Sequence, residues 1–294
     1  MRTITILGGS GFLGSQLSFF LSKNSNNRVI IFDKKKTNKI EKNQKFIKGN
    51  ILNTKQLSRA IKKSDYVFNF AALADLNDAR NKPLETAMIN VIGTIKALQI
   101  SKKFKVKKFI QASSIYANSE QGGFYGSSKK AAEDYIEKFN KKFKLKFTIL
   151  RFGSLFGNGA DRSNGINIII DYALKNESLL YKGSKKAARK YIHVLDACRA
   201  CAKAISKKYD NKYLNITGKN KIKITKLLNI MSDITNISKK KIFYKNFPNE
   251  GHYISEPKKF IPRRGINLNL IKYQDFKKGL TSQYIERKKK YKLW

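Results

Sequence analysis

Apolar and polar positions follow two different rhythms along the first 150 residues of this chain. Short runs of β-branched and other apolar residues, bounded by polar or glycine-containing segments, are typical of buried strands. Two longer segments, 84–103 and 127–142, repeat apolar residues at the spacing of an amphipathic helix. Strands that alternate with helices predict a parallel sheet covered by helices on both faces. The predicted strands are residues 3–7, 28–32, 45–47, 66–70, 107–112 and 146–151.

Three glycines, Gly8, Gly11 and Gly14, follow the first predicted strand at three-residue intervals. Glycine permits a tight turn and the close approach of a pyrophosphate, and the next helix offers free N–H groups at its N-terminus. Asp33 ends the second predicted strand, where a carboxylate can bind ribose hydroxyls and repel a 2′-phosphate. The pattern predicts a dinucleotide site that favours NAD(H), although the lysines at 34–36 could neutralise the phosphate of NADP(H). A plain turn before a helix is the alternative.

Tyr125 and Lys129 are four residues apart at the start of a predicted helix, so both lie on one face of it. A phenol has a pKa near ~10 and is a poor base at neutral pH. A fixed ammonium one turn away favours the phenolate and is expected to lower that pKa. The pair therefore predicts a base that takes a proton from a sugar or alcohol hydroxyl. A solvated Lys beside a half-buried Tyr is the alternative explanation.

Seven segments together resemble the extended short-chain dehydrogenase/reductase family, in its nucleotide-sugar epimerase/dehydratase branch. The resemblance covers nearly all 294 residues, and the order and spacing of the segments are more specific than any one of them. The segments are residues 8–14, 48–51, 70–72, 90–94, 111–114, 150–157 and 189–196.

The resemblance implies an α/β fold, with a Rossmann-type doubly wound parallel sheet and a smaller C-terminal substrate-binding domain. Residues 1–156 would form the NAD-binding domain, with a return segment at about 191–216. Residues 157–190 and 217–294 would form the part that binds a nucleotide-sugar.

The family pattern also assigns roles to individual residues. It implies that Ser114, Tyr125 and Lys129 are catalytic, and Ser113 competes with Ser114 for the serine's role. It implies NAD as the cofactor. The cofactor-binding residues would be Gly8, Gly11, Phe12, Leu13, Gly14, Asp33, Asn50, Ile51, Phe70, Ala71, Ala72, Asn90, Tyr125 and Lys129.

Three residues are candidates for contact with the substrate: Ser154, Asn164 and Arg189. Many relatives have an Asn in place of Ser154 that holds the substrate's diphosphate, whereas Arg189, the usual partner of that Asn, is present. The loop 158–167 resembles a substrate-binding loop, although a plain connection fits its composition equally well. Residues 251–253 and 257–264 are candidates to close over the site, and Arg263 and Arg264 are either contacts to the diphosphate or surface residues.

The neighbours of Ser114 bear on the type of reaction. Dehydratases of this family commonly carry an Asp-Glu pair directly after the catalytic Thr, whereas Ser114 is followed by Ile115 and Tyr116. We therefore expect an epimerase, most simply one that inverts C4 of a UDP-sugar for polysaccharide biosynthesis. In relatives the helices corresponding to 84–103 and 127–142 pair in a homodimer. The alternatives are a dehydratase or reductase of the same family, and a non-catalytic NAD(H)-binding protein.

The amino-acid composition limits the kinds of partner that this chain is expected to bind. The chain has 62 Lys and Arg against 20 Asp and Glu, a net charge of +42, which would attract anionic substrates. The lysines are spread along the whole chain, so we expect no specific nucleic-acid partner. No apolar run is long enough for a membrane span. Cys198 and Cys201 cannot close a zinc site alone, so we expect buried thiols, no metal and a cytoplasmic protein.

Overall fold

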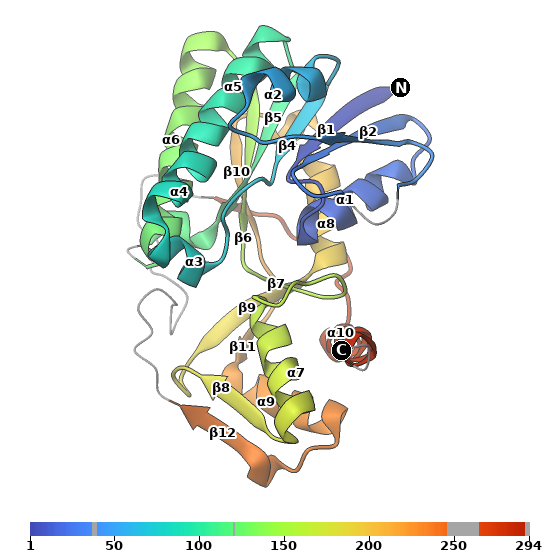
Figure 1. Ribbon diagram of the computed structural model, residues 1–294, viewed down its shortest axis with the longest axis vertical. Coiled ribbons are helices and arrows are strands. Elements are labelled where there is room, and N and C mark those ends of the chain that lie inside the picture. Colours follow the sequence, from blue (N-terminus) through green and yellow to red (C-terminus); the bar gives the residue numbers. More distant parts are fainter. Residues whose placement is uncertain (37–39, 120, 246–264, 292–294) are drawn as a thin grey trace.

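The computed structural model describes residues 1–36, 40–119, 121–245 and 265–291. The described chain forms a larger part around an eight-stranded sheet and a smaller part below it (Figure 1). No helix within these residues is long and apolar enough to cross a membrane.

The large sheet is parallel throughout. Its first strand lies near the middle, and the order reverses between the first and fourth strands. This reversal is the topological switch point at which doubly wound folds bind their ligands. In order across the sheet, the strands are β13 (Ile266–Asn267), β10 (Lys212–Ile216), β6 (Phe147–Phe152), β5 (Lys108–Ser114), β4 (Tyr66–Asn69), β1 (Arg2–Leu7), β2 (Asn27–Asp33) and β3 (Gln44–Lys48).

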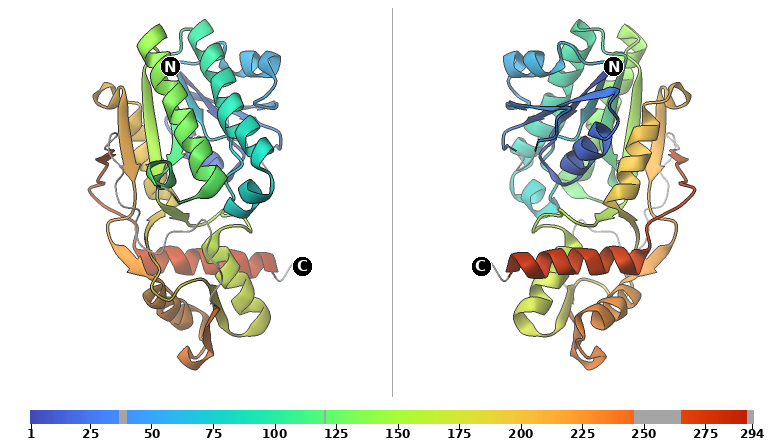
Figure 2. Two further views of the ribbon diagram at one scale, coloured as in Figure 1. Left: turned by 90° about the vertical axis from the view of Figure 1, so that its left-hand side faces the viewer. Right: turned by 90° about the vertical axis from the view of Figure 1, so that its right-hand side faces the viewer.

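Helices cover both faces of the large sheet, and each face has its own apolar core. Helices α1 (Phe12–Ser22) and α8 (Val194–Ala204) pack together on one face. Helices α2 (Thr54–Ile61), α5 (Gly93–Lys103) and α6 (Gly123–Phe143) cover the other (Figures 1 and 2). Shorter elements connect them: α3 (Leu76–Asn81), α4 (Pro83–Ala87), the π-helix η1 (Met88–Ile92), and the 3₁₀-helices η2 (Ile115–Asn118) and η3 (Lys207–Tyr209).

The smaller part has a separate core formed by three helices and two short sheets. Helix α10 crosses this part and packs against α7 and α9 (Figure 2). The elements are β7 (Ser154–Phe156), α7 (Gly165–Asn176), β8 (Leu179–Lys182), β9 (Ala188–His193), β11 (Lys221–Lys223), α9 (Ile224–Thr235), the 3₁₀-helix η4 (Lys239–Lys241), β12 (Ile242–Lys245) and α10 (Phe276–Tyr291).

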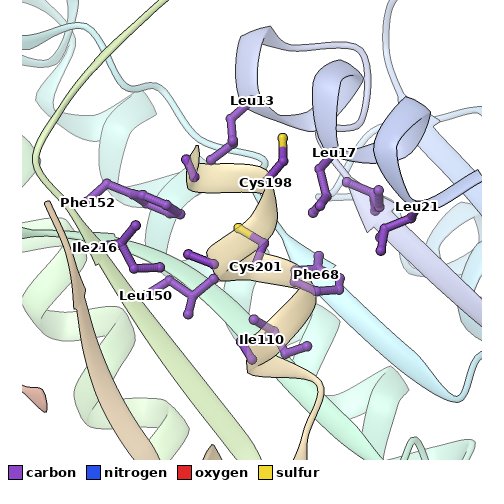
Figure 3. Close-up of a cluster of buried hydrophobic side chains, with 14 of the residues drawn as sticks. Leu13, Leu17, Leu21, Phe68, Ile110, Leu150, Phe152, Cys198, Cys201 and Ile216 are labelled. Atoms are coloured by element: carbon purple, nitrogen blue, oxygen red, sulfur yellow. The ribbon is translucent and has the colours of Figure 1, made fainter. Parts of the chain in front are cut away.

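The two cysteines lie where the sequence predicts them, as buried thiols on α8. Cys198 and Cys201 are both fully buried in the core between α8, α1 and the sheet (Figure 3). Burial raises the pKa of both thiols, that of Cys198 to about 12. The protonated thiols therefore act as small apolar side chains of this core.

The six predicted strands are all present, with ends that differ by one or two residues. The predicted helix 84–103 contains the π-helical segment in its first half, and the second helix begins at Gly123 rather than at 127. The return segment is present as α8 and β10. Strand β13 also pairs with the large sheet, although it lies in the range 217–294 that the sequence predicts for the smaller part.

Candidate active site

The candidate residues follow four adjacent strands of the large sheet. Because β2, β1, β4 and β5 are parallel neighbours, their carboxyl ends lie along one edge. The glycine segment follows β1, Asp33 ends β2, residues 70–72 follow β4 and Ser114 ends β5. The fold therefore brings together groups that are far apart in the chain.

The glycine segment makes a turn that side chains would obstruct. Gly8 has a φ of +76°, and a Cβ there would lie 2.5 Å from the amide nitrogen of Ala71. A Cβ on Gly14 would lie 2.2 Å from the carbonyl oxygen of Gly8. Helix α1 begins directly after Gly11 with no side-chain cap, so its first N–H groups stay available to an anion. Leu13 is buried in the core and can offer a ligand only its backbone.

Asp33 is held beside this turn. Its Oδ2 accepts a hydrogen bond from the backbone N–H of Ser10 at 3.0 Å, and its Oδ1 accepts one from the backbone N–H of Lys35 at 3.1 Å. The Ser10 hydroxyl is buried and has no hydrogen-bond partner in the described chain. A glycine cradle, an adjacent carboxylate and an unsatisfied hydroxyl fit the diphosphate and ribose of NAD. The lysines at 34–36 are exposed next to it.

The residues expected around the adenine and nicotinamide make contacts within the protein itself. The Asn50 side-chain oxygen accepts a hydrogen bond from the Leu52 N–H at 3.0 Å, which shapes the turn after β3. Ile51 is buried against Gly93. Ala71 lies under the glycine turn, and Phe70 packs edge-on against Phe68 of β4 and Phe152 of β6.

Asn90 links the loop after β4 to helix α6. Its side chain is almost completely buried and bonds to both backbone groups of Leu73, at 2.8 and 3.0 Å. Its Nδ2 also donates to the Ser128 hydroxyl at 2.9 Å. All the polar atoms of this side chain therefore bind the protein, and any effect on the cofactor is through the loop that Asn90 holds.

Tyr125, Lys129 and Ser114 meet at the carboxyl end of β5. The Lys129 Nζ lies 5.4 Å from the centre of the Tyr125 ring and donates to the carbonyl of Ala112 at 3.2 Å. The hydroxyls of Ser114 and Tyr125 are hydrogen-bonded to each other. The Ser113 hydroxyl instead donates to Glu133 at 2.6 Å. The geometry thus favours Ser114 over Ser113 as the serine next to the tyrosine.

Burial dominates the titration of this pair. It raises the pKa of the Tyr125 phenol to about 12, and the hydrogen bond with Ser114 acts in the opposite direction. Burial lowers the pKa of the Lys129 ammonium to about 8, opposed by Glu133. The expected lowering of the Tyr125 pKa by Lys129 is therefore wrong for the protein chain alone. Removing the phenolate from water costs more than the nearby ammonium returns.

The substrate candidates lie in or beside the smaller part. Arg189 on β9 donates to the Tyr181 hydroxyl at 3.2 Å. Its pKa is raised although burial opposes this, because Tyr181, Tyr191 and Tyr116 surround the guanidinium. Tyr116 follows Ser114 by two residues and its ring packs edge-on against Tyr125, so Arg189 is placed toward the catalytic residues.

The other two substrate candidates differ from Arg189. Ser154 is half-buried at the start of β7, next to Tyr191 in the small sheet. Asn164 caps helix α7, because its Oδ1 accepts from the Ile166 N–H at 3.1 Å while its Nδ2 donates to the Leu155 carbonyl at 2.9 Å. Its side chain therefore serves the local fold. The segment 251–264, with its two arginines, lies outside the described residues.

Sequence reasoning missed two side chains behind the catalytic pair. Glu133 and Arg151 form an ion pair with an Nη2–Oε2 distance of 2.6 Å, and each is only 1% exposed. The spacing of four residues between Lys129 and Glu133 was visible in the sequence. The pairing with Arg151 was not, because it depends on the packing of α6 against β6.

The comparisons with known proteins agree with this geometry. A sequence model described as "NAD dependent epimerase/dehydratase family" matches residues 4–217. A Methanocaldococcus jannaschii protein named "Putative UDP-glucose 4-epimerase" is 30% identical over 239 residues, which are 74% of this chain and 77% of that protein. A "dTDP-D-glucose 4,6-dehydratase" of Dictyostelium discoideum is 28% identical over 68% of this chain and 54% of its own length.

The fold is also similar to that of a solved structure. The UDP-glucuronic acid 4-epimerase from Bacillus cereus, in complex with UDP-glucuronic acid and NAD, superimposes with a TM-score of 0.83. The match covers 99% of this chain and 100% of the other, at 22% sequence identity. At this identity the likeness establishes the shared α/β fold.

Proposed function

Since the chain belongs to the NAD-dependent epimerase/dehydratase family, we propose that it is a nucleotide-sugar epimerase that inverts C4 of a UDP-sugar. The observation that carries this proposal is the Ser114–Tyr125–Lys129 arrangement at the switch-point edge of the sheet. Its action in the cytoplasm and its assembly as a homodimer stay predictions of the sequence.

The residues for NAD line the edge described above. The turn at Gly8–Gly14 would hold the diphosphate, and the Asp33 carboxylate would bind the adenosine ribose. The Lys129 ammonium would bind the second ribose, below the nicotinamide. NAD, when bound, supplies a group that accepts a hydride from the sugar carbon and can return it.

The chain's own residues then manage the proton. The Tyr125 oxygen takes the proton of the sugar hydroxyl. It later returns the proton to the same oxygen when the ketone is reduced again. The Ser114 hydroxyl donates a hydrogen bond to the same sugar oxygen and holds it next to Tyr125. Lys129, protonated below its pKa of about 8, stabilises the phenolate form of Tyr125. Arg189 would bind the substrate's diphosphate from the smaller part.

The residues after Ser114 favour epimerisation over dehydration. Elimination of water needs an additional acid close to the sugar ring, whereas 3₁₀-helix η2 presents Ile115 and Tyr116 directly after Ser114. The nearby buried carboxylate, Glu133, is already bound by Arg151 and Ser113 and lies behind Lys129. A dehydratase remains the second candidate, because the relatives of this chain include both kinds of enzyme.

The test is NMR of UDP-, GDP-, CDP- and dTDP-sugars incubated with the protein and NAD in deuterated water. An epimer with no solvent deuterium at the inverted carbon would support the proposal and identify the substrate, because the hydride returns within the site. A deoxy-ketosugar carrying deuterium would establish a dehydratase instead. Stoichiometric consumption of reduced cofactor would indicate a reductase, and no change in any sugar would contradict an epimerase acting on these substrates.

A further inference from the structure

The buried carboxylate of Glu133 lies directly behind the catalytic pair. Glu133 follows Lys129 by four residues on α6, so the two side chains are neighbours on one face of the helix. Its Oε1 accepts a hydrogen bond from the Ser113 hydroxyl at 2.6 Å and one from the Arg151 Nε at 2.9 Å. Its Oε2 accepts from the Arg151 Nη2 at 2.6 Å. A carboxylate with three such bonds has one available position.

This cluster joins three elements of the fold. Ser113 on β5 and Arg151 on β6 are direct neighbours in the sheet register, and Glu133 reaches both from α6. The Arg151 guanidinium also lies 4.4 Å from the centre of the Tyr213 ring on β10. The Tyr213 hydroxyl in turn bonds to Glu137, one turn further along α6. The end of β5 is therefore tied to the helix that carries Tyr125 and Lys129.

We propose that Glu133 is a positioning residue for the Ser114–Tyr125–Lys129 site. It orients Ser114 through Ser113, and its carboxylate stabilises the charged ammonium of Lys129. The inference rests on the proposed function, because it concerns the same site. Ser113 directly precedes Ser114 at the end of β5, so its hydrogen bond to Glu133 fixes the part of the strand from which Ser114 interacts with Tyr125.

The protonation of Lys129 depends on the groups around its ammonium. Tyr125 and Glu133 face it from α6, and the Arg151 guanidinium lies behind Glu133 on β6. Strand β5 offers the uncharged Ala112 carbonyl, and Tyr213 of β10 lies against the Arg151 guanidinium. Burial disfavours the ammonium form, and Glu133 opposes that effect. Without the carboxylate, Arg151 would be an uncompensated positive charge behind Lys129, and the ammonium would lose its proton at lower pH.

Glu133→Gln tests this directly, because the amide has nearly the same shape and lacks the charge. Lysine labelled with ¹³C at Cε would be followed by NMR against pH in the full-length protein, with Lys129→Arg to assign the signal that titrates near 8. We expect the Lys129 pKa to fall by about one unit in Glu133→Gln. In the NAD-loaded enzyme the basic limb of kcat/KM should move to lower pH by the same amount. An unchanged Lys129 titration would overturn the electrostatic role.

Two further variants separate positioning from general stability. Asp171→Asn removes a carboxylate from the ion pair with Arg287 in the smaller part, and it should leave the Lys129 titration and the pH profile unchanged. Ser113→Ala keeps the charge of Glu133 and is mild enough to test the geometry if Glu133→Gln does not fold. We expect kcat to fall about three- to tenfold, with NAD affinity and the Lys129 titration unchanged. A normal kcat in Ser113→Ala would overturn the orienting role.

The two proposals can fail separately. The NMR titration needs neither substrate nor cofactor, so a shifted Lys129 pKa supports the charge relation even if no sugar is turned over. Whether the protein is an epimerase would then be decided by the NMR experiment with the nucleotide-sugars alone.

Discussion

A phenol whose pKa is raised to about 12 cannot serve as a base near neutral pH without help, so the chemistry of this site depends on what stabilises the Tyr125 phenolate. Tyr125→Phe removes the hydroxyl and leaves the ring contact with Tyr116. We expect kcat for epimerisation to fall by ~10²–10⁴-fold, the usual contribution of positioned acid–base catalysis. NAD affinity, measured by fluorescence quenching, should stay near that of the wild type. Turnover close to normal would contradict the proposed role of Tyr125.

Asp33 is the residue that should distinguish the two dinucleotides. Asp33→Asn keeps a side-chain oxygen for the Ser10 N–H and removes the charge that repels a 2′-phosphate. Because the exposed lysines at 34–36 then face the phosphate alone, we expect the ratio of the NADP Kd to the NAD Kd to fall about tenfold or more. Calorimetric titration with both cofactors measures it. Lys23→Gln, on the far end of α1, is the charge-change control and should leave the ratio unaltered. An unchanged ratio in Asp33→Asn would show that the lysines or the loop set the preference.

At the scale of single elements, the C-terminus of α8 is stabilised by a buried lysine. Lys108 on β5 is 2% exposed, and its Nζ donates to the carbonyls of Ala204, Ile205 and Ser206 at 3.1, 3.2 and 2.7 Å. It also pairs with Asp210 at 2.6 Å. A cation at a helix C-terminus satisfies orphan carbonyls and the helix dipole.

Lys108→Met should therefore leave three carbonyls without their donor and Asp210 without its buried cation. We expect the free energy of unfolding, from urea titration, to fall by about 3 kcal/mol. Lys146 binds the same Asp210 from the surface at 2.9 Å, so Lys146→Met is a matched control. It should cost only about 0–1 kcal/mol, as exposed ion pairs do. Equal losses in the two variants would show that burial of Lys108 adds nothing.

The elements that follow from local pattern were predictable, and the contacts between elements were not. Tyr125 and Lys129 are one helical turn apart, and Gly8 to Gly14 lie next to a strand, so their spacing alone suggests their roles. The burial that raises the Tyr125 pKa depends on how α6 packs on β5, which no local spacing records. The same is true of the Arg151–Glu133 pair and of β13, whose two residues reach the large sheet after a long excursion through the smaller part.

At the scale of the whole molecule, the outer face of α4, η1 and α6 carries apolar side chains that no described element covers. Leu84, Met88 and Ile92 are exposed at four-residue intervals along α4 and the π-helical segment. Phe124 and Tyr135 are exposed on α6, three helical turns apart. These helices pack against each other and lie side by side on one surface (Figure 2). Exposed apolar side chains gathered on adjacent helices are typical of a protein–protein interface.

We expect this surface to pair with a second copy of the chain. The same exposed residues of the two copies would then bury each other about a two-fold axis. Met88→Glu combined with Tyr135→Lys places charges at its centre, and light scattering coupled to gel filtration should show a change from two chains to one. Phe243→Lys, which adds a charge at an exposed aromatic of β12 in the smaller part, should leave two chains. A wild-type protein that is monomeric at micromolar concentration would refute the pairing, whereas dissociation by Phe243→Lys would move the interface to the smaller part. Because α6 also carries Tyr125 and Lys129, the double variant should show lower turnover only to the extent that pairing holds this helix in place.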